Sequence, residues 1–248
     1  MADFGPKMRL DHLMVQNGLI ESRSRARAAI DAGGVTVDGQ PARAASQGVS
    51  EDAVVTVVEA HGWVGRAALK LDHARSLWPV AVEGRIVLDV GASTGGFTEV
   101  CLARGAAKVF AVDVGQGQMH PKVSADPRVV NLEKTDARTL DDEIIPETPG
   151  LIVCDASFIG LAKVLPAALA LADADTDLIA LVKPQFEGDG PTDAGKKGVV
   201  KDPKAHAEAV RRVSEWLENS GWSVQGTTES PITGGDGNIE FLVWARQP

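Results

Sequence analysis

A cluster of glycines directly after a short apolar run is the clearest chemical signal in this sequence. Residues 86–90 predict a buried strand, residues 91–96 follow it with three glycines, and residues 97–105 predict a helix. Glycine tolerates positive φ and lets a backbone approach a ligand closely, while the first amide groups of a helix lack internal partners. The stretch therefore predicts a nucleotide-binding turn, and a glycine-rich turn without a ligand is the alternative. The candidate binding residues of this turn are Asp89, Gly91, Ser93, Gly95, Gly96 and Phe97.

The spacing of these glycines narrows the kind of nucleotide site. It does not match the dinucleotide pattern G-x-G-x-x-G, and no Gly-Lys-Ser/Thr follows that would grip a triphosphate. An acidic residue followed by Gly-x-x-x-Gly-Gly instead resembles the first motif of S-adenosylmethionine-dependent methyltransferases. That resemblance implies S-adenosyl-L-methionine as the cofactor.

Two further acidic residues follow predicted strands and are candidates for cofactor contacts. Asp113 ends the predicted strand 108–112, about 20 residues after the glycine turn, where an acid can accept hydrogen bonds from ribose hydroxyls. Asp136 follows the predicted strand 129–132 and either holds the adenine amino group or caps the helix that begins at Ala137. Asp89 lies inside the first motif, where it either orders the turn or meets the methionine amine through water.

Four charged residues scattered along the chain are the candidate catalytic groups. Asp155 and Lys183 end the predicted strands 151–154 and 177–182, Lys70 lies in a helical segment before the first strand, and Glu240 lies near the C-terminus. Taken singly, Asp155 could be a helix cap, Glu240 an exposed hairpin residue and both lysines surface cations. However, charges at the carboxyl ends of parallel strands more often line a site.

Together the four residues resemble the Lys-Asp-Lys-Glu tetrad of the ribose 2'-O-methyltransferases related to the heat-shock-induced rRNA enzyme. A ribose hydroxyl is a poor nucleophile, so methyl transfer gains from a base, and a lysine acts as a base only when it is neutral. A neighbouring lysine lowers a lysine pKa and neighbouring carboxylates raise it. The resemblance implies that Lys183 is the base and that Lys70, Asp155 and Glu240 position it and the hydroxyl.

The elements that must position these residues form an α/β pattern. Short apolar strands alternate with helices and turns, and a long helix is predicted from Asp202-Pro203 to Asn219. Residues 222–229 and 239–245 can then pair as an antiparallel hairpin across residues 231–237. This predicts a Rossmann-like sheet that ends in a hairpin, an architecture that fits a methyltransferase better than a dinucleotide-binding fold.

A smaller unit precedes this sheet, and the chain divides near His61. Helices are predicted from Leu10 towards Gly18 and from a cap at Ser22 or Ser24 to Ala32, followed by strands at 35–37 and 54–58 with an Asp38-Gly39 turn signal between them. Arginines 23, 25 and 27 crowd the start of the second helix, where positive charge opposes the helix dipole. Phosphate would supply the missing negative charge.

This N-terminal pattern, from Arg9-Leu10-Asp11 to Val37-Asp38-Gly39, resembles the S4 RNA-binding domain. The resemblance implies that RNA docks on the second helix, with contacts that depend on phosphate geometry and weaken with salt. A solvated surface shared with Glu21 and Asp31 is the alternative for the arginines. The candidate RNA-binding residues are Arg9, Arg23, Arg25, Arg27 and Arg66.

Nearly the whole chain resembles the TlyA family, through these motifs and through Asp113–Gln118, Lys183–Glu187, Lys197–Pro203 and Gly237–Glu240. The resemblance implies an S4-like domain at 1–60, a linker at 61–66 and an FtsJ-like methyltransferase domain at 67–248. It also implies S-adenosylmethionine-dependent 2'-O-methylation of cytidine in ribosomal RNA, 16S and/or 23S. The expected partner is ribosomal RNA or a ribosomal subunit, with no obligate protein partner and no metal. Residues 188–201 would form a mobile loop over the site or an ordinary surface loop.

Composition sets the remaining expectations. The 248 residues carry a net charge of -9 and 44% hydrophobic residues, which suits a globular chain with local rather than general affinity for polyanions. Cys101 and Cys154 lie in apolar runs, and the absence of a signal segment or of about 18 successive apolar residues predicts a reduced cytoplasmic protein. Two rival functions remain, a membrane-lytic protein, after the hemolysin label of some family members, and a non-catalytic S4-type RNA-binding protein.

Overall fold

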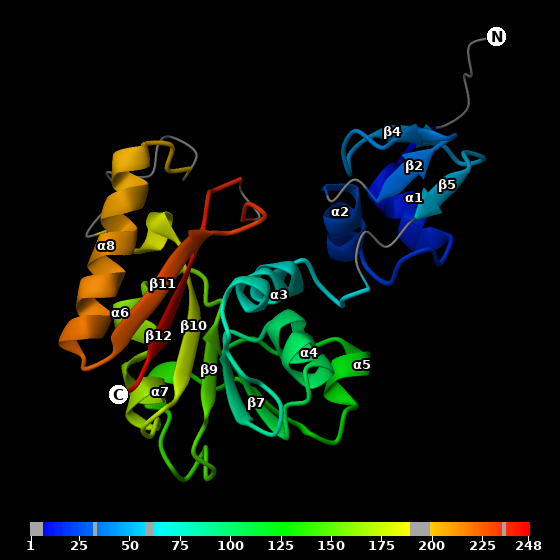
Figure 1. The fold of residues 1–248 in the computed structure, drawn as a ribbon. Helices are drawn as coiled ribbons and strands as arrows, with labels where there is room; N and C mark the ends of the chain where they lie inside the picture. Colours follow the sequence, from blue (N-terminus) through cyan, green and yellow to red (C-terminus); the bar gives the residue numbers. More distant parts are fainter. Residues whose placement is uncertain (1–6, 32–33, 58–61, 189–198, 235–236) are drawn as a thin grey trace. The chain divides into compact units, whose positions relative to one another are not determined.

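The computed structural model describes residues 7–31, 34–57, 62–188, 199–234 and 237–248. The chain divides into two compact units, residues 1–66 and 67–248 (Figure 1). Residues 189–198 of the expected loop, His61 of the expected linker and residues 235–236 of the expected hairpin turn lie outside the described residues.

The N-terminal unit packs two helices against short strands. Helices α1 (Leu10–Gln16) and α2 (Arg23–Asp31) are joined by a turn, and the Ser22 hydroxyl accepts a hydrogen bond from the Arg25 amide, as a cap should. Strand β1 (Lys7–Arg9) pairs with β4 (Gly48–Ser50), and β2 (Val35–Val37) lies between β3 (Gln40–Pro41) and β5 (Val55–Val57). The core of the unit is formed by Leu10, Leu13, Met14, Ala26, Ile30, Val35, Val37 and Val49.

The Asp38-Gly39 signal marks a tight hairpin between β2 and β3. Both residues have positive φ, 50° and 77°. A two-residue hairpin turn needs this conformation to match the right-handed twist of its flanking strands. The strand expected at 54–58 begins one residue later, at Val55, and residue 58 lies outside the described part of the chain; β1, β3 and β4 were not predicted. Strands of two or three residues are too short to leave a periodic signal in the sequence.

The second unit contains a seven-stranded sheet, which confirms the predicted α/β class. The strand order is β11-β12-β10-β9-β6-β7-β8, with β12 antiparallel to both of its neighbours and the other described pairs parallel. The strands are β6 (Ile86–Val90), β7 (Lys108–Asp113), β8 (Val129–Glu133), β9 (Leu151–Cys154), β10 (Asp177–Val182), β11 (Ser223–Glu229) and β12 (Phe241–Arg246).

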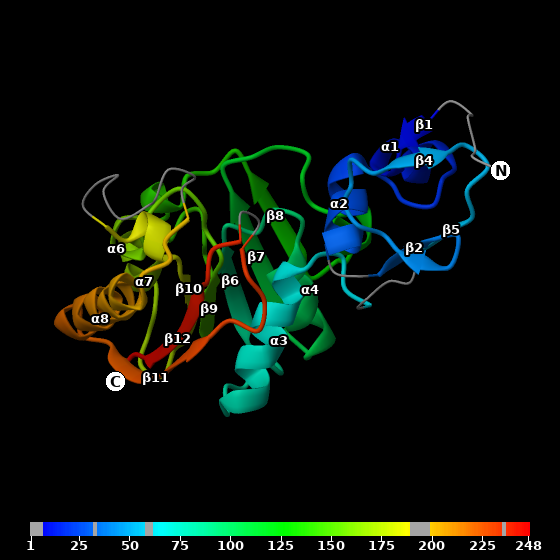
Figure 2. The same cartoon turned by 90° about the horizontal axis from the view of Figure 1, so that it is seen from above.

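Helices cover both faces of this sheet, as the views in Figures 1 and 2 show. Leu88 and Val90 of β6 belong to the core beneath α6, α7 and α8, whereas Asp89 between them points to the other face and meets Thr98 of α4. The helical segments are α3 (Ala67–Leu77), α4 (Gly96–Ala103), α5 (Pro121–Ser124), η1 (Ala137–Thr139), α6 (Leu161–Val164), α7 (Pro166–Ala170), η2 (Pro184–Phe186) and α8 (Pro203–Asn219).

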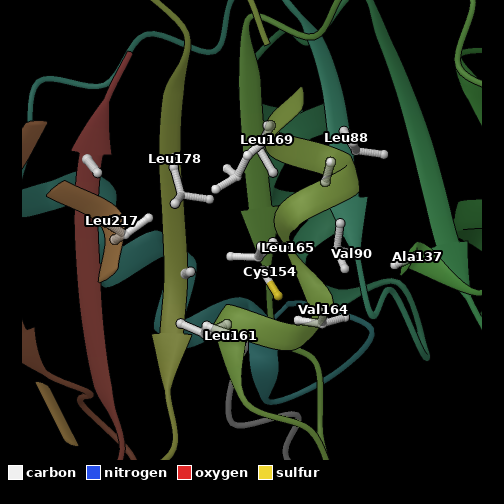
Figure 3. Packing of buried hydrophobic residues seen from close by; sticks show 14 of the residues in the cluster. Leu88, Val90, Ala137, Cys154, Leu161, Val164, Leu165, Leu169, Leu178 and Leu217 are labelled. Atoms are coloured by element: carbon white, nitrogen blue, oxygen red, sulfur yellow. The ribbon is translucent and has the colours of Figure 1, made fainter. Parts of the chain in front are cut away.

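The largest core lies between the sheet and helices α6, α7 and α8. Figure 3 shows Leu161 and Leu165 packed over Cys154 and Leu178 of the central strands. Strands β9 and β10 are buried along their whole length because helices cover both of their faces, which explains their uninterrupted apolar sequences. Cys101 and Cys154 are buried and free of disulfide bonds.

The predicted C-terminal elements agree with the structure apart from shifts of one or two residues at strand ends. Helix α8 begins after Asp202, whose side chain accepts a hydrogen bond from the Lys204 amide. Strand β12 begins at Phe241 rather than at Ile239, because its pairing partner β10 ends at Val182. Glu240 therefore precedes the strand instead of lying within it. In the described part of the chain, no helix is both long and apolar enough to span a membrane.

Candidate active site

The register of the sheet brings three of the four candidate catalytic residues to one edge. Phe241 pairs with Val182, so the antiparallel register continues with Glu240 beside Lys183, each one residue beyond its strand. Cys154 pairs with Val90 in the parallel register, so Asp155 follows next to Gly91. The Asp155 amide donates to the Val90 carbonyl at 3.1 Å and holds that position.

Helix α3 supplies the fourth residue, Lys70. The start of α4 approaches the start of α3 so closely that a Cβ on Gly96 would lie 3.0 Å from the Ala68 amide nitrogen. The glycine at this position therefore allows α3 to lie close to the sheet edge. Lys70 is 7% exposed, although it lies in an amphipathic helix where a lysine would ordinarily face solvent.

The four side chains form one connected ion-pair network. Lys70 Nζ lies 2.7 Å from Glu240 Oε2 and 3.2 Å from Asp155 Oδ2. Lys183 Nζ lies 2.6 Å from Asp155 Oδ1, so Asp155 bridges the two ammonium groups. All four side chains are at least 88% buried, and burial strengthens electrostatic interactions that solvent would otherwise screen.

The two lysines differ in what surrounds them. Burial lowers the pKa of Lys70, but the negative charges of Asp155 and Glu240 together outweigh it, so the pKa lies above its ordinary value. Lys70 is therefore held as an ammonium. Lys183 faces one of these carboxylates and two neutral oxygens, donating to the Asp155 carbonyl at 3.2 Å and to Ser157 Oγ at 2.8 Å.

Gly91 opens the predicted nucleotide-binding turn and has room for no larger side chain. Its φ is 81°, and a Cβ there would lie 2.8 Å from the Ala156 Cα. Gly95, with φ 88°, is the N-cap residue of α4. Ser93, which lies between Gly91 and Gly95, has φ 47°. Three residues with positive φ within five positions fold the backbone into the tight concave turn expected from the sequence.

Asp113 connects this turn to the next loop. One carboxylate oxygen accepts a hydrogen bond from the Ser93 amide at 2.8 Å, and the other accepts from the Gly115 amide at 2.7 Å. Each oxygen keeps a second lone pair that can accept a ligand hydroxyl. The side chain thus both orders the turn and faces the space above it.

Two adjoining cavities lie above the turn. The larger has a volume of about 550 Å³, and its lining includes Asp113, Asp136, Ala137 and Phe158. The smaller, of about 200 Å³, is lined by all four charged residues and by Phe97. The two share Gly91, Ser93, Asp155 and Ser157 as lining residues, so a ligand in the larger cavity ends beside the ion-pair network. A volume of about 300–1,000 Å³ is usual for a cofactor pocket.

The remaining candidate cofactor residues have structural contacts of their own. Asp136 caps η1 by accepting from the Arg138 amide and pairs with the Arg138 side chain, which lowers its pKa to about 2. It also lines the larger cavity, so both of its predicted roles stay open. Asp89, Gly95 and Gly96 are not among the described lining residues of either cavity.

Asp89 is fully buried beneath the turn, where one oxygen accepts a hydrogen bond from the Thr98 hydroxyl at 2.6 Å. Burial raises its pKa to about 7. These contacts favour the first of its two predicted roles, which is to order the turn.

Two residues at the site were not singled out from the sequence, although they lie only two and three positions after Asp155. Ser157 accepts a hydrogen bond from Lys183 and lines both cavities. Phe158 has φ 67°, is 89% exposed and lies 5.5 Å from the Phe186 ring. An exposed aromatic ring beside a nucleotide pocket can stack on a base. The signal that could have found it is an aromatic residue directly after a catalytic strand end.

In the N-terminal unit, carboxylates already accompany several of the candidate RNA-binding arginines. Arg9 and Arg23 both pair with Asp11, and Arg25 pairs with Glu21. At the start of α2, Arg23 and Arg25 thus already have carboxylate partners, and the Arg25–Glu21 pair agrees with the alternative of a surface shared with Glu21. Arg27 is exposed and Arg66 is half-buried.

The strand order of the large unit, with a glycine turn after its central strand and an antiparallel final pair, defines the class of S-adenosylmethionine-dependent methyltransferases. Comparison with known proteins agrees with this class. Residues 63–247 match the FtsJ-like methyltransferase model, and residues 8–55 match the S4 domain model.

Several relatives extend over most of the chain. The 16S/23S rRNA (cytidine-2'-O)-methyltransferase TlyA of Mycobacterium tuberculosis is 46% identical, over 97% of this chain and 90% of its own. Hemolysin A of Brachyspira hyodysenteriae is 36% identical, over 95% of this chain and 98% of its own. A solved structure from Streptococcus thermophilus, described as a hemolysin, covers 98% of this chain and 89% of its own, with a TM-score of 0.77 and 36% identity. The chain belongs to the TlyA family of FtsJ-like methyltransferases.

Proposed function

We propose that this chain transfers a methyl group from S-adenosylmethionine to the ribose 2'-hydroxyl of cytidine in ribosomal RNA. The M. tuberculosis relative that is 46% identical is named for this activity on 16S and 23S rRNA. The proposed substrate is therefore 16S rRNA, 23S rRNA or both, and the reaction is tested on each.

The observation that carries the proposal is the junction of the two cavities. The larger one has room for a nucleoside, and both Asp113, which is available for ribose hydroxyls, and Asp136 line it. Gly91 lines both cavities, and its turn approaches Ala156 so closely that any Cβ would clash with the backbone there. The residues present therefore fit S-adenosylmethionine, with its methionine end directed to the ion-pair network.

The four charged residues take distinct roles in this reaction. The bound cofactor supplies an electrophilic methyl group on its sulfonium. Lys183 Nζ, as the free amine, accepts the proton of the 2'-hydroxyl while the oxygen attacks. Asp155 orients Lys183, and Glu240 with Asp155 keeps Lys70 charged, so that the Lys70 ammonium stabilises the negative charge that develops on the ribose oxygen.

The N-terminal unit supplies the RNA-docking surface in this proposal. Its arginines at the start of α2 recognise phosphate geometry in a folded RNA, and the partner is ribosomal RNA or a ribosomal subunit. A substrate of this kind also accounts for the expected cytoplasmic location, where ribosomes work. No further protein partner is part of the proposal.

Mapping of 2'-O-methyl groups tests the function directly. Ribosomal RNA from cells that lack the gene is compared with RNA from cells that carry it, and purified 30S and 50S subunits are methylated in vitro with labelled cofactor. The proposal expects new marks at cytidines in RNA from cells with the gene and label in at least one subunit. Saturable RNA binding without any mark would favour the non-catalytic alternative, and lysis of lipid vesicles by the purified chain without any mark would favour the lytic one.

A further inference from the structure

One buried carboxylate holds two of the exposed arginines on the N-terminal unit. Asp11 lies in the first turn of α1, and its side chain is only 5% exposed. Arg9 precedes α1 and Arg23 begins α2, and their side chains are 48% and 52% exposed. Residues from the starts of two different helices therefore meet at a single carboxylate.

The contacts restrain both guanidinium groups in the same way. Arg9 donates from Nε to Asp11 Oδ1 and from Nη2 to Oδ2, both at 2.9 Å. Arg23 donates from Nε and Nη2 to Oδ2, at 3.3 and 2.9 Å. Each group thus uses one edge of its planar fork, and within the described part of the chain neither arginine has a further hydrogen-bond partner. None of their remaining nitrogen atoms is among the buried unpartnered ones, so these N–H groups are available to a ligand.

The two arginines and the carboxylate carry a net charge of +1, because one buried negative charge faces two partly exposed positive ones. The guanidinium pKa of Arg9 is raised by its hydrogen bonds to Asp11, and the pKa of the Asp11 carboxyl lies well below its usual range for the same reason. Arg9 and Asp11 are therefore both charged throughout the physiological pH range.

We propose that Asp11 is the positioning residue of the RNA-docking surface, which holds Arg9 and Arg23 side by side so that their free edges bind RNA phosphates. An arginine that is already restrained loses less side-chain entropy when it binds, and a planar fork recognises a phosphate only in a limited set of orientations. The inference rests on the proposed function, since it names how the same chain docks on ribosomal RNA.

A change of Asp11 has opposite effects on RNA binding, depending on whether its carboxylate positions the arginines or only offsets their charge. Asp11→Asn removes a negative charge from the docking surface. If the carboxylate acts only as a countercharge that repels RNA phosphates, its removal strengthens RNA binding. A positioning carboxylate gives the reverse, because the freed arginines no longer hold their orientation. Glu21→Gln is the matched control, since Glu21 is 63% exposed, pairs with Arg25 at the start of the same helix and gives the same change in net charge.

The experiment measures binding of the full-length variants to ribosomal RNA extracted from cells that lack this protein, over a range of salt concentrations. We expect Asp11→Asn to weaken binding by about tenfold and to reduce the salt slope by about 1 to 2, which corresponds to one or two phosphate contacts. Glu21→Gln should bind as well as the unchanged chain or better. Stronger binding by Asp11→Asn, in step with Glu21→Gln, would overturn the proposal.

A double-variant comparison separates positioning from general stability. If Asp11 acts through the two arginines, adding Asp11→Asn to Arg9→Ala/Arg23→Ala should change RNA affinity by less than about twofold. A further loss of affinity in that background would contradict the proposal. If thermal unfolding shows that Asp11→Asn does not fold, Asp11→Glu replaces it, because it keeps the charge but moves the carboxylate by one methylene. Unchanged RNA affinity of Asp11→Glu would then count against positioning.

The proposed function can fail independently of this inference. Absence of 2'-O-methyl transfer by the unchanged chain would refute the function, whereas the role of Asp11 is judged on RNA affinity and its salt dependence alone.

Discussion

At the scale of single residues, the site depends on a few positions where no other side chain fits. Gly91 combines a φ of 81° with an approach to Ala156 that leaves no space for a methyl group. Gly84 has a similar φ of 71° but lies in open space before β6. Substitutions at these two positions therefore distinguish the effect of backbone strain, which both share, from the effect of a steric clash in the binding turn, which occurs only at Gly91.

We expect Gly91→Ala to abolish saturable binding of S-adenosylmethionine in a calorimetric titration, because the new Cβ displaces the segment that joins the two cavities. The matched variant Gly84→Ala carries comparable backbone strain, about 1 kcal/mol, without a steric clash. It should bind the cofactor with unchanged affinity. Equal cofactor affinity in both variants would show that the turn is not the binding surface.

Asp89 is predicted to make stability depend on pH. Burial raises its pKa to about 7 in the folded chain, whereas in the unfolded chain it titrates near its ordinary value, so the folded state binds the proton more tightly. Stability therefore falls as pH rises from about 4 to about 7, by as much as roughly 4 kcal/mol. Urea unfolding of the unchanged chain and of Asp89→Asn between these pH values tests this. The difference between the two free energies of unfolding should change across the window, and a constant difference would contradict the assignment.

At the scale of elements, the two ends of the sheet have different tasks. The carboxyl ends of β9 and β10 carry Asp155 and Lys183, while Asp177 begins β10 at the opposite end and is fully buried. Asp177 accepts hydrogen bonds from Arg85 at 2.6 Å, from Trp244 Nε1 at 2.8 Å and from Arg246 at 3.1 Å. It joins β10 to β12 and to the segment before β6.

We expect Asp177→Asn to lower the free energy of unfolding by about 3 kcal/mol, because it leaves two arginines without their buried carboxylate. Burial raises the pKa of Asp177, but the bonds from Arg246, Trp244 and Arg85 outweigh it and the pKa is lowered. The stabilisation is thus present above the unfolded pKa and lost as pH falls through the folded one. Urea unfolding at neutral and acidic pH measures the free energy of unfolding of the unchanged chain and of Asp177→Asn. Asp175→Asn, at an exposed position, is the control. Loss of methylation in a folded Asp177→Asn chain would show that the two ends are not separate.

Prediction from sequence succeeded for elements with a strong local signal. Strands 151–154 and 177–182 are uninterrupted apolar runs, and α8 has a capping Asp202 followed by proline, so these boundaries agree with the structure. The four charged residues could be proposed because Asp155 and Lys183 follow strand ends and because the family resemblance supplied Lys70 and Glu240. Asp11, Ser157 and Asp177 could not be found in this way, because their importance comes from tertiary contacts that no local pattern encodes.

At the scale of the whole molecule, the chain carries two kinds of binding surface with different physics. In the proposed function, half-exposed arginines of the N-terminal unit such as Arg9 and Arg23 bind RNA phosphates, whereas the cofactor binds in the larger cavity, whose lining includes apolar residues such as Val112 and Val164. Salt screens exposed charges strongly and burial of apolar surface hardly at all.

We therefore expect salt to separate the two affinities. Between about 50 and 200 mM salt, the KM for ribosomal RNA should rise by at least tenfold, while the Kd for S-adenosylmethionine changes by less than about twofold. Steady-state methylation of extracted rRNA and calorimetric titration of the cofactor measure the two quantities. An RNA KM that is independent of salt would contradict docking through phosphate contacts.

The most direct test of the central claim is single-turnover methylation of ribosomal RNA by the Lys183→Ala chain, with Lys163→Ala as an exposed-lysine control. The account predicts that Lys183→Ala binds RNA and cofactor normally but transfers methyl groups at least about a hundredfold more slowly, while Lys163→Ala is unimpaired. Methyl transfer by Lys183→Ala at the full rate would show that Lys183 is not the base.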